Sequence, residues 1–230
     1  MLCMGKSSFS QVFCGKEYAC ELNRFPESKT IALFLPGLSG KPFNQRFDFI
    51  ANACDDSCVS FFRFNCWESS TELSKKTLSE LLLVLDDVLF FLSEEGFKRI
   101  FLIGKSFGGE LALLSNNHLI SGLILIAPAI GVSSNFNLVE FANKKISEIN
   151  VCADVKVDKE FLSKISVPVL IIHGAVDPSV PLENSQKLVS FLKRGELFVV
   201  EEADHSFMEK DARTYARLSM KEFLERFALI

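Results

Sequence analysis

The 230-residue sequence lacks the patterns of a metal site, a nucleic-acid-binding surface and a membrane span. Its three histidines stand at none of the spacings of a zinc site, and its seven cysteines form no C-x-x-C pair. Lys and Arg are scattered, and the net charge is −4. The longest apolar run, LLLVLDDVLFFL, contains two Asp and is too short to cross a bilayer. We therefore expect no metal, no nucleic-acid partner and no stable membrane insertion.

A secretory signal is also missing, because the N-terminal stretch MLCMGKSSFSQVF has no apolar core of seven or more residues. The odd number of cysteines favours reduced, mostly buried thiols over a disulfide framework. Together these features predict a cytoplasmic protein. The sequence leaves its oligomeric state open.

Tyrosine and tryptophan are scarce, with two and one residues, whereas phenylalanine is abundant at 23. Hydrophobic residues make up 48% of the chain, which is enough to bury a large core. The length fits one domain. We expect a single α/β domain over residues 1–230 with a phenylalanine-rich interior.

Apolar strands alternate with helical patterns along the chain. An antiparallel hairpin around Gly15 is expected to come first, and helices are expected at 43–53, 71–96 and 207–227, the second one capped by Thr71. The remaining expected strands are continuous apolar runs at 30–37, 58–64, 98–104, 121–129, 167–174 and 195–203. Such runs are typical of strands covered on both faces. The pattern predicts a mostly parallel central sheet with helices on both faces.

One segment, residues 132–166, interrupts the alternation and is longer than an ordinary loop. Its mixed apolar and polar pattern suggests short helices. We interpret it as a short cap-like or lid-like insertion over the strand ends, with an extra helix packed beside the sheet as the alternative.

In parallel α/β sheets, ligands bind at the carboxyl ends of the strands. The stretch Gly104-Lys105-Ser106-Phe107-Gly108 lies at such an end and matches G-x-S-x-G. A nucleophilic serine on a sharp strand-to-helix turn needs glycines beside it, because larger side chains would collide there. A glycine-rich turn with an idle serine is the plain alternative. A phosphate-binding loop is disfavoured because its upstream glycine is missing.

A serine hydroxyl is a weak nucleophile unless a base accepts its proton. His205 is the best candidate, since it follows the strand expected at 195–203 and begins a turn. His173 lies at a strand end beside the next candidate loop and is expected to be structural. His118 is expected on the surface.

The base in turn needs an acid that orients it, and Asp177 follows the strand expected at 167–174. Asp204 is a weaker candidate, because neighbours on a chain rarely point together. Asp154 and Asp158 lie in the insertion and are expected to be solvated. The order Ser106, Asp177, His205 is the order of α/β-hydrolases.

A developing oxyanion requires donors as well. The backbone N–H of Phe107, which follows the nucleophile, is one candidate. The second is Leu38 N–H in the loop Pro36-Gly37-Leu38-Ser39-Gly40, which could also be an ordinary Pro–Gly turn.

These ordered motifs make the chain resemble the α/β-hydrolase superfamily, most closely its small intracellular esterase, lipase-like and serine-aminopeptidase-like branches. FLPGLSG stands at the oxyanion loop, LIGKSFGG at the nucleophile elbow, VPVLIIHGAVDPSVP at the acid loop and ADHSF at the histidine turn. The resemblance covers nearly the whole chain. It implies a sheet of about eight strands, a metal-free triad and acyl-transfer chemistry without a cofactor.

Three departures from the family pattern concern the pocket. Pro36 replaces the usual His of the oxyanion loop, whose donor is a backbone group. Lys105 precedes the nucleophile where many members carry His, and its role is left open. RFNCWESS replaces a glycine-rich stretch, so Trp67 either lines the pocket or is simple packing.

The resulting prediction is a serine hydrolase that cleaves small to medium acyl esters, with Trp67, Lys105 and Phe136 as candidate pocket residues. Phe136 belongs to NFNLVEFA, which suggests an apolar acyl pocket. An acylaminoacyl-type peptidase and a thioesterase are alternatives within the enzymes. A non-catalytic binding module is the alternative from another class.

Overall fold

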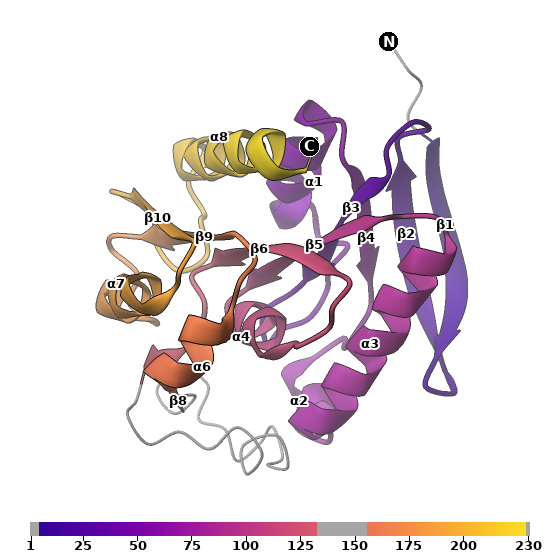
Figure 1. Ribbon diagram of the computed structural model, residues 1–230, viewed down its shortest axis with the longest axis horizontal. Helices are drawn as coiled ribbons and strands as arrows, with labels where there is room; N and C mark the ends of the chain where they lie inside the picture. Colours follow the sequence, from indigo (N-terminus) through magenta and orange to yellow (C-terminus); the bar gives the residue numbers. More distant parts are fainter. Residues whose placement is uncertain (1–4, 133–155, 229–230) are drawn as a thin grey trace.

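A central sheet organises the protein in its computed structural model, which describes residues 5–132 and 156–228. Eight strands form this sheet (Figure 1). In spatial order they are β1 (Gly5–Phe13), β2 (Lys16–Arg24), β4 (Ser60–Phe64), β3 (Thr30–Leu35), β5 (Arg99–Lys105), β6 (Ile120–Ile126), β9 (Val169–Gly174) and β10 (Gly195–Val200). The pairs β1–β2 and β2–β4 are antiparallel, and all other pairs are parallel. The predicted mostly parallel sheet, entered through a hairpin, is confirmed.

Helices cover both faces of the sheet, which explains why its inner strands are apolar throughout. Every residue of β3, TIALFL, is buried. One face is covered by α1 (Asp48–Asp56), which follows the short η1 (Gln45–Phe47), and by α8 (Lys210–Phe227). The other face is covered by α3 (Leu78–Glu94), α4 (Phe107–Leu114), α6 (Lys159–Lys164) and α7 (Leu182–Phe191) (Figure 1). The sheet thus separates two hydrophobic clusters, both rich in phenylalanine.

The single helix predicted over 71–96 is in fact two helices. A short α2 (Ser70–Leu73) is capped by the Ser69 side chain, and α3 begins only at Leu78. Thr77 caps α3 in a capping box with Glu80: its hydroxyl accepts the Glu80 N–H, and the Glu80 carboxylate accepts the Thr77 N–H at 2.6 Å. The capping motif therefore interrupts the apolar periodicity that suggested one continuous helix.

The two ends of the predicted insertion pair with each other. The strands β7 (Gly131–Val132) and β8 (Lys156–Val157) form a separate two-stranded sheet, and α6 follows directly. Residues 133–155, which include Phe136 and Asp154, lie outside the described residues. The interpretation of residues 132–166 as a lid therefore stays a prediction.

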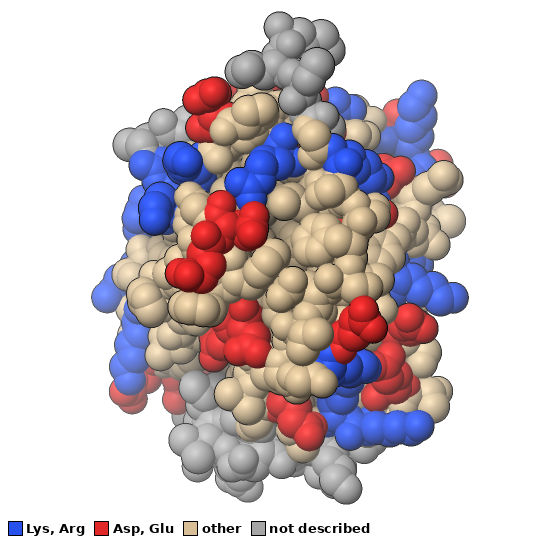
Figure 2. All heavy atoms as spheres, turned by 90° about the vertical axis from the view of Figure 1, so that its right-hand side faces the viewer, with Lys and Arg blue, Asp and Glu red and all other residues tan. Residues whose placement is uncertain are grey.

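The face formed by β1, β2 and α3 carries charges of both signs, interspersed with uncharged residues (Figure 2). Several of these charges are paired across elements, as in Lys16–Glu72 at 2.8 Å and Arg24–Glu95 at 2.6 Å. This face therefore presents no continuous basic surface.

Within residues 5–132 and 156–228, no helix has both the length and the apolar character that a bilayer crossing requires.

None of the five cysteines in the described parts of the chain forms a disulfide. Three of them, Cys20, Cys54 and Cys66, are buried. Burial raises the pKa of the Cys20 thiol and of the Cys66 thiol to about 12, so both stay protonated and act as small apolar side chains.

We expect Thr77→Ala to lower the free energy of unfolding by about 1 kcal/mol, because it removes the N-cap of α3. Thr71→Ala is the matched control, since Thr71 is an exposed residue inside α2. It should change stability by less than about 0.5 kcal/mol. Urea denaturation followed by circular dichroism measures both, and equal losses would contradict the capping role of Thr77.

Candidate active site

The candidate residues gather where four parallel strands end. Ser106 comes directly after β5, Leu38 follows β3, Asp177 follows β9 and His205 follows β10. Parallel strands place their carboxyl ends at one edge of the sheet, so segments far apart in sequence meet there. The parallel arrangement is therefore what brings these residues together.

Ser106 occupies a left-handed backbone conformation, with φ 53° and ψ −116°, between β5 and α4. Non-glycine residues rarely adopt such conformations, and the surrounding structure must hold them. The flanking glycines permit the tight turn, because a Cβ on Gly104 would collide with the Gly108 carbonyl and a Cβ on Gly108 with the Leu35 carbonyl. Ser106 is almost completely buried.

Ser106, His205 and Asp177 form a continuous hydrogen-bonded chain. The Ser106 Oγ lies 3.0 Å from His205 Nε2, and His205 Nδ1 lies 2.7 Å from Asp177 Oδ2. Because a carboxylate only accepts hydrogen bonds, Nδ1 must carry the proton and donate a hydrogen bond to Asp177. In the neutral imidazole, Nε2 is then free to accept the hydroxyl hydrogen of Ser106.

Asp177 is held by the loop that follows β9. Its Oδ1 accepts the backbone N–H groups of Ser179 at 2.8 Å and Val180 at 2.9 Å, while Oδ2 faces His205. Its side chain is 1% exposed. This loop therefore fixes the direction in which the carboxylate presents Oδ2 to the imidazole.

Two opposing effects act on the pKa of Asp177. Burial by itself would raise that pKa, but hydrogen bonds from His173 and His205 and from the backbone of Val180 and Ser179 hold it well below the usual aspartate range. Asp177 is consequently a carboxylate at neutral pH.

His173 is a structural histidine in the wall behind Asp177. It is fully buried, its Nδ1 lies 2.7 Å from Ser185 Oγ, and its Nε2 lies 3.0 Å from the Val180 carbonyl. Since the carbonyl only accepts, Nε2 carries the proton, and it also lies 3.4 Å from Asp177 Oδ2. His173 thus ties β9, α7 and the acid loop together.

The other polar candidates are not part of the hydrogen-bonded chain of Ser106, His205 and Asp177. His118 is exposed, as expected for a surface residue. The Asp204 carboxylate accepts the backbone N–H groups of Ser206 and Met208, so it shapes the histidine turn. Asp158 caps α6 by accepting the Phe161 N–H, which corrects the expectation of a simply solvated side chain.

The loop after β3 lies against Ser106. A Cβ on Gly37 would stand 3.4 Å from Ser106 Cβ, and Leu38 lines the same crevice as Ser106. Among the described residues, neither the Leu38 N–H nor the Phe107 N–H donates a hydrogen bond to the protein. Both amides are thus available to a group bound at Ser106.

Trp67 lies behind this loop, so it fits the packing alternative and does not line the described part of the pocket. Its side chain is fully buried, its indole N–H donates to the Gly37 carbonyl at 3.0 Å, and its ring packs edge-on against Phe107. Gly40 has φ 64°, and a Cβ there would collide with the Trp67 carbonyl. Trp67 therefore supports the backbone of the loop over residues 36–40 on the side that faces the protein interior.

A crevice of about 180 Å³ lies beside Ser106. Its lining includes two cationic side chains, Lys105 and Arg46, beside Ser106 and His205. Lys105 is 6% exposed, and its Nζ lies 3.4 Å from His205 Nε2. Arg46, which donates to Ser39 Oγ at 2.8 Å, was not among the residues predicted from sequence. No local periodicity could have identified it, because η1 carries it to the crevice.

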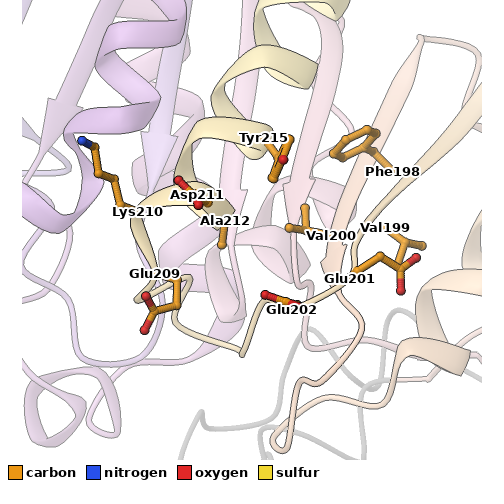
Figure 3. A pocket seen from close by; sticks show the side chains of 10 residues that line it. All are labelled: Phe198, Val199, Val200, Glu201, Glu202, Glu209, Lys210, Asp211, Ala212 and Tyr215. Carbon is orange, nitrogen blue, oxygen red and sulfur yellow. The ribbon is translucent and has the colours of Figure 1, made fainter.

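A larger hollow of about 670 Å³ lies elsewhere, between the edge strand β10 and the start of α8 (Figure 3). Carboxylates and aromatic rings line it, among them Glu201, Glu202, Glu209 and Tyr215. It contains none of the three hydrogen-bonded residues of the candidate site. Within the described ranges, no cluster of three or more His, Cys, Asp or Glu side chains is placed to hold a metal ion.

Comparison with known proteins places the chain among hydrolases. The model of the dienelactone hydrolase family matches residues 67–229. No curated protein sequence matches the chain.

Three solved structures share the fold over nearly the whole chain. They are Est1E from Butyrivibrio proteoclasticus (19% identity, 95% of this chain and 98% of that one, TM-score 0.77), a dienelactone hydrolase from Anabaena variabilis (15%, 98% and 99%, 0.76) and an esterase from Pyrococcus furiosus (17%, 98% and 92%, 0.76). These likenesses confirm the α/β-hydrolase fold.

The low pKa of Asp177 makes stability depend on pH in a defined direction. A carboxyl group whose pKa is lower in the folded protein than in the unfolded chain stabilises the fold above the unfolded value, near 4, and that contribution is lost as the pH falls below it. Asp177→Asn removes the ionisation. Its free energy of unfolding should therefore fall less steeply than that of the wild type between about pH 5 and pH 2.

Urea denaturation at a series of pH values measures this slope. Asp211→Asn, at an exposed position near the start of α8, is the control and should keep the wild-type slope. An unchanged slope in Asp177→Asn would contradict the role of the buried carboxylate.

Proposed function

Because the chain belongs to the dienelactone hydrolase family and is a hydrolase acting on ester bonds, we propose that it cleaves small to medium carboxylic esters through a covalent acyl-enzyme. One observation carries this proposal: the hydrogen-bonded chain from Ser106 through His205 to Asp177, with distances of 3.0 and 2.7 Å. A nucleophile, a base and an orienting acid in this arrangement are what acyl transfer requires.

In the first step, Ser106 Oγ attacks the carbonyl carbon of the ester while His205 Nε2 accepts the hydroxyl proton. Asp177 keeps the imidazole in the tautomer that can accept this proton, and its charge stabilises the imidazolium that forms. The tetrahedral intermediate then releases the alcohol, which takes its proton from Nε2. Water repeats the sequence on the acyl-enzyme and frees the acid.

The oxyanion of the intermediate is proposed to bind the N–H groups of Leu38 and Phe107. Phe107 is the first residue of α4, so the positive end of the helix dipole adds to its N–H. Trp67 holds the Gly37 carbonyl from behind, which orients the peptide that carries the Leu38 N–H. Backbone donors at both positions explain why Pro36 can replace the usual histidine.

The volume of the crevice at Ser106, as far as described residues line it, favours a small substrate. This volume of about 180 Å³ equals roughly six water molecules, enough for an ester group with a short acyl chain. A solved structure of the similar Est1E is described with bound ferulic acid, so an aromatic acyl group is a further candidate here. An acylaminoacyl-type peptidase, a thioesterase and a cytoplasmic location stay predictions from sequence.

Replacing Ser106 by Ala should reduce hydrolysis of p-nitrophenyl acetate by at least about 10³-fold, because no other group can form the acyl-enzyme. A fluorophosphonate probe should label the folded wild type at Ser106 and leave the variant unlabelled, as mass spectrometry of the peptide would show. Wild-type turnover in Ser106→Ala would exclude this mechanism. Absence of labelling in the wild type would favour a binding module.

The substrate class can be tested with matched substrates that differ only in the bond cleaved. We expect kcat/KM to be highest for oxygen esters of acyl groups up to medium length, compared with thioesters and anilides of the same acids. Methyl ferulate belongs in this panel as the aromatic member. A preference for anilides would indicate a peptidase, and a preference for thioesters a thioesterase.

A further inference from the structure

Lys105 is the residue of the nucleophile motif that the triad mechanism leaves without a role. It is the last residue of β5 and precedes Ser106 directly. The residue is only 6% exposed, yet its ammonium lines the crevice at Ser106. The Nζ atom lies 3.4 Å from His205 Nε2, the nitrogen that also faces Ser106 Oγ at 3.0 Å.

The position of Nζ relative to Nε2 matters because Nε2 performs two proton transfers. It first takes the proton of Ser106, and it then delivers that proton to the oxygen of the departing alcohol. During delivery, the leaving oxygen must come within hydrogen-bond distance of Nε2. A donor 3.4 Å from Nε2 can reach the same oxygen, since one oxygen atom can lie within about 3 Å of two nitrogens that are this close together.

We propose that Lys105 is a further catalytic residue, whose ammonium donates a hydrogen bond to the leaving-group oxygen as the tetrahedral intermediate collapses. This inference rests on the proposed function and deepens it. It assigns a hydrogen-bond donor to the alcohol oxygen of the ester, as the Leu38 and Phe107 amides are the proposed donors to the carbonyl oxygen.

The step balances without any further reactant. The bond between the acyl carbon and the leaving oxygen breaks, and its electron pair moves to that oxygen. The carbonyl double bond forms again from the oxyanion. The proton on His205 Nε2 moves to the leaving oxygen, while Lys105 keeps all three of its protons and stabilises the negative charge that develops there.

The charges around His205 also favour a negative charge on the leaving oxygen. Asp177 faces Nδ1, Lys105 faces Nε2, and Arg46 lies in the wall of the same crevice. The carboxylate stabilises the imidazolium, and the two cations stabilise the negative charge that develops on the leaving oxygen in the same crevice.

The contribution of Lys105 should depend on the leaving group. Nitrophenolate departs with little help, because its negative charge is delocalised. An alkoxide carries a concentrated charge and needs both a proton and a hydrogen-bond donor. Lys105 should therefore matter most for alkyl esters, which makes it a determinant of specificity on the alcohol side.

The experiment compares p-nitrophenyl, phenyl and ethyl acetate, which share one acyl group, in the wild type and in Lys105→Met. We expect kcat/KM, which reports acylation, to fall by about 10²-fold for ethyl acetate and by less than about 3-fold for p-nitrophenyl acetate. Lys105→Arg, which keeps a cationic donor, should recover much of the activity on ethyl acetate.

Arg46→Met is the matched control, because it removes a positive charge from the same crevice without altering the neighbour of Nε2. Its loss of kcat/KM should be equal for the three esters. A loss in Lys105→Met that is equal for all three esters, or no loss at all, would overturn the proposal. Circular dichroism verifies the fold of each variant, and Lys105→Arg provides the decisive comparison if Lys105→Met does not fold.

Labelling of Ser106 with the fluorophosphonate probe distinguishes a failure of the Lys105 proposal from a failure of the proposed acyl-enzyme mechanism. If the fluorophosphonate probe modifies Ser106 in the wild type and in Lys105→Met, the nucleophile is intact and the leaving-group series alone decides the role of Lys105. If the wild type is not labelled, the acyl-enzyme mechanism fails, and the assignment of Lys105 fails with it.

Discussion

The left-handed backbone of Ser106 is the constraint on which the site depends. At φ 53° it directs the hydroxyl out of the strand-to-helix turn, and it is tolerated only because the surrounding elements are packed closely. Gly104 and Gly108 allow β5, α4 and the end of β3 to approach one another without side chains between them. The same close approach puts the loop after β3 against Ser106. The positions of Ser106 and of the proposed oxyanion donors are therefore consequences of one packing arrangement.

A second layer of interactions fixes the groups around Ser106. Asp177 is held by two backbone N–H groups and lies beside His173, which in turn contacts Ser185 on α7. Trp67 fixes the loop on the opposite side through the Gly37 carbonyl. These contacts are buried, so each hydrogen bond also avoids the cost of an unsatisfied polar group. The geometry around Ser106 is therefore fixed by contacts within the fold.

The sequence predicted the sheet and the hydrogen-bonded residues because both depend on local patterns. Continuous apolar runs marked the parallel strands, and the order Ser106, Asp177, His205 at three strand ends indicated their meeting place. The prediction of one helix over 71–96 was wrong, because a capping box at Thr77 and Glu80 outweighed the apolar periodicity. The role of Trp67 was likewise undecided, since an indole that supports a loop and one that faces a substrate look the same in sequence.

The sequence by itself determined which residue types stand at the ends of the strands and how the elements alternate, because these are properties of neighbouring residues. Only the tertiary structure decided which side chains face each other across the crevice. Lys105 could have pointed to the adjacent loops, yet it lies 3.4 Å from His205, a residue 100 positions away. Arg46 reaches the same crevice from η1. Such contacts arise from the register and packing of elements distant in sequence, and no local pattern encodes them.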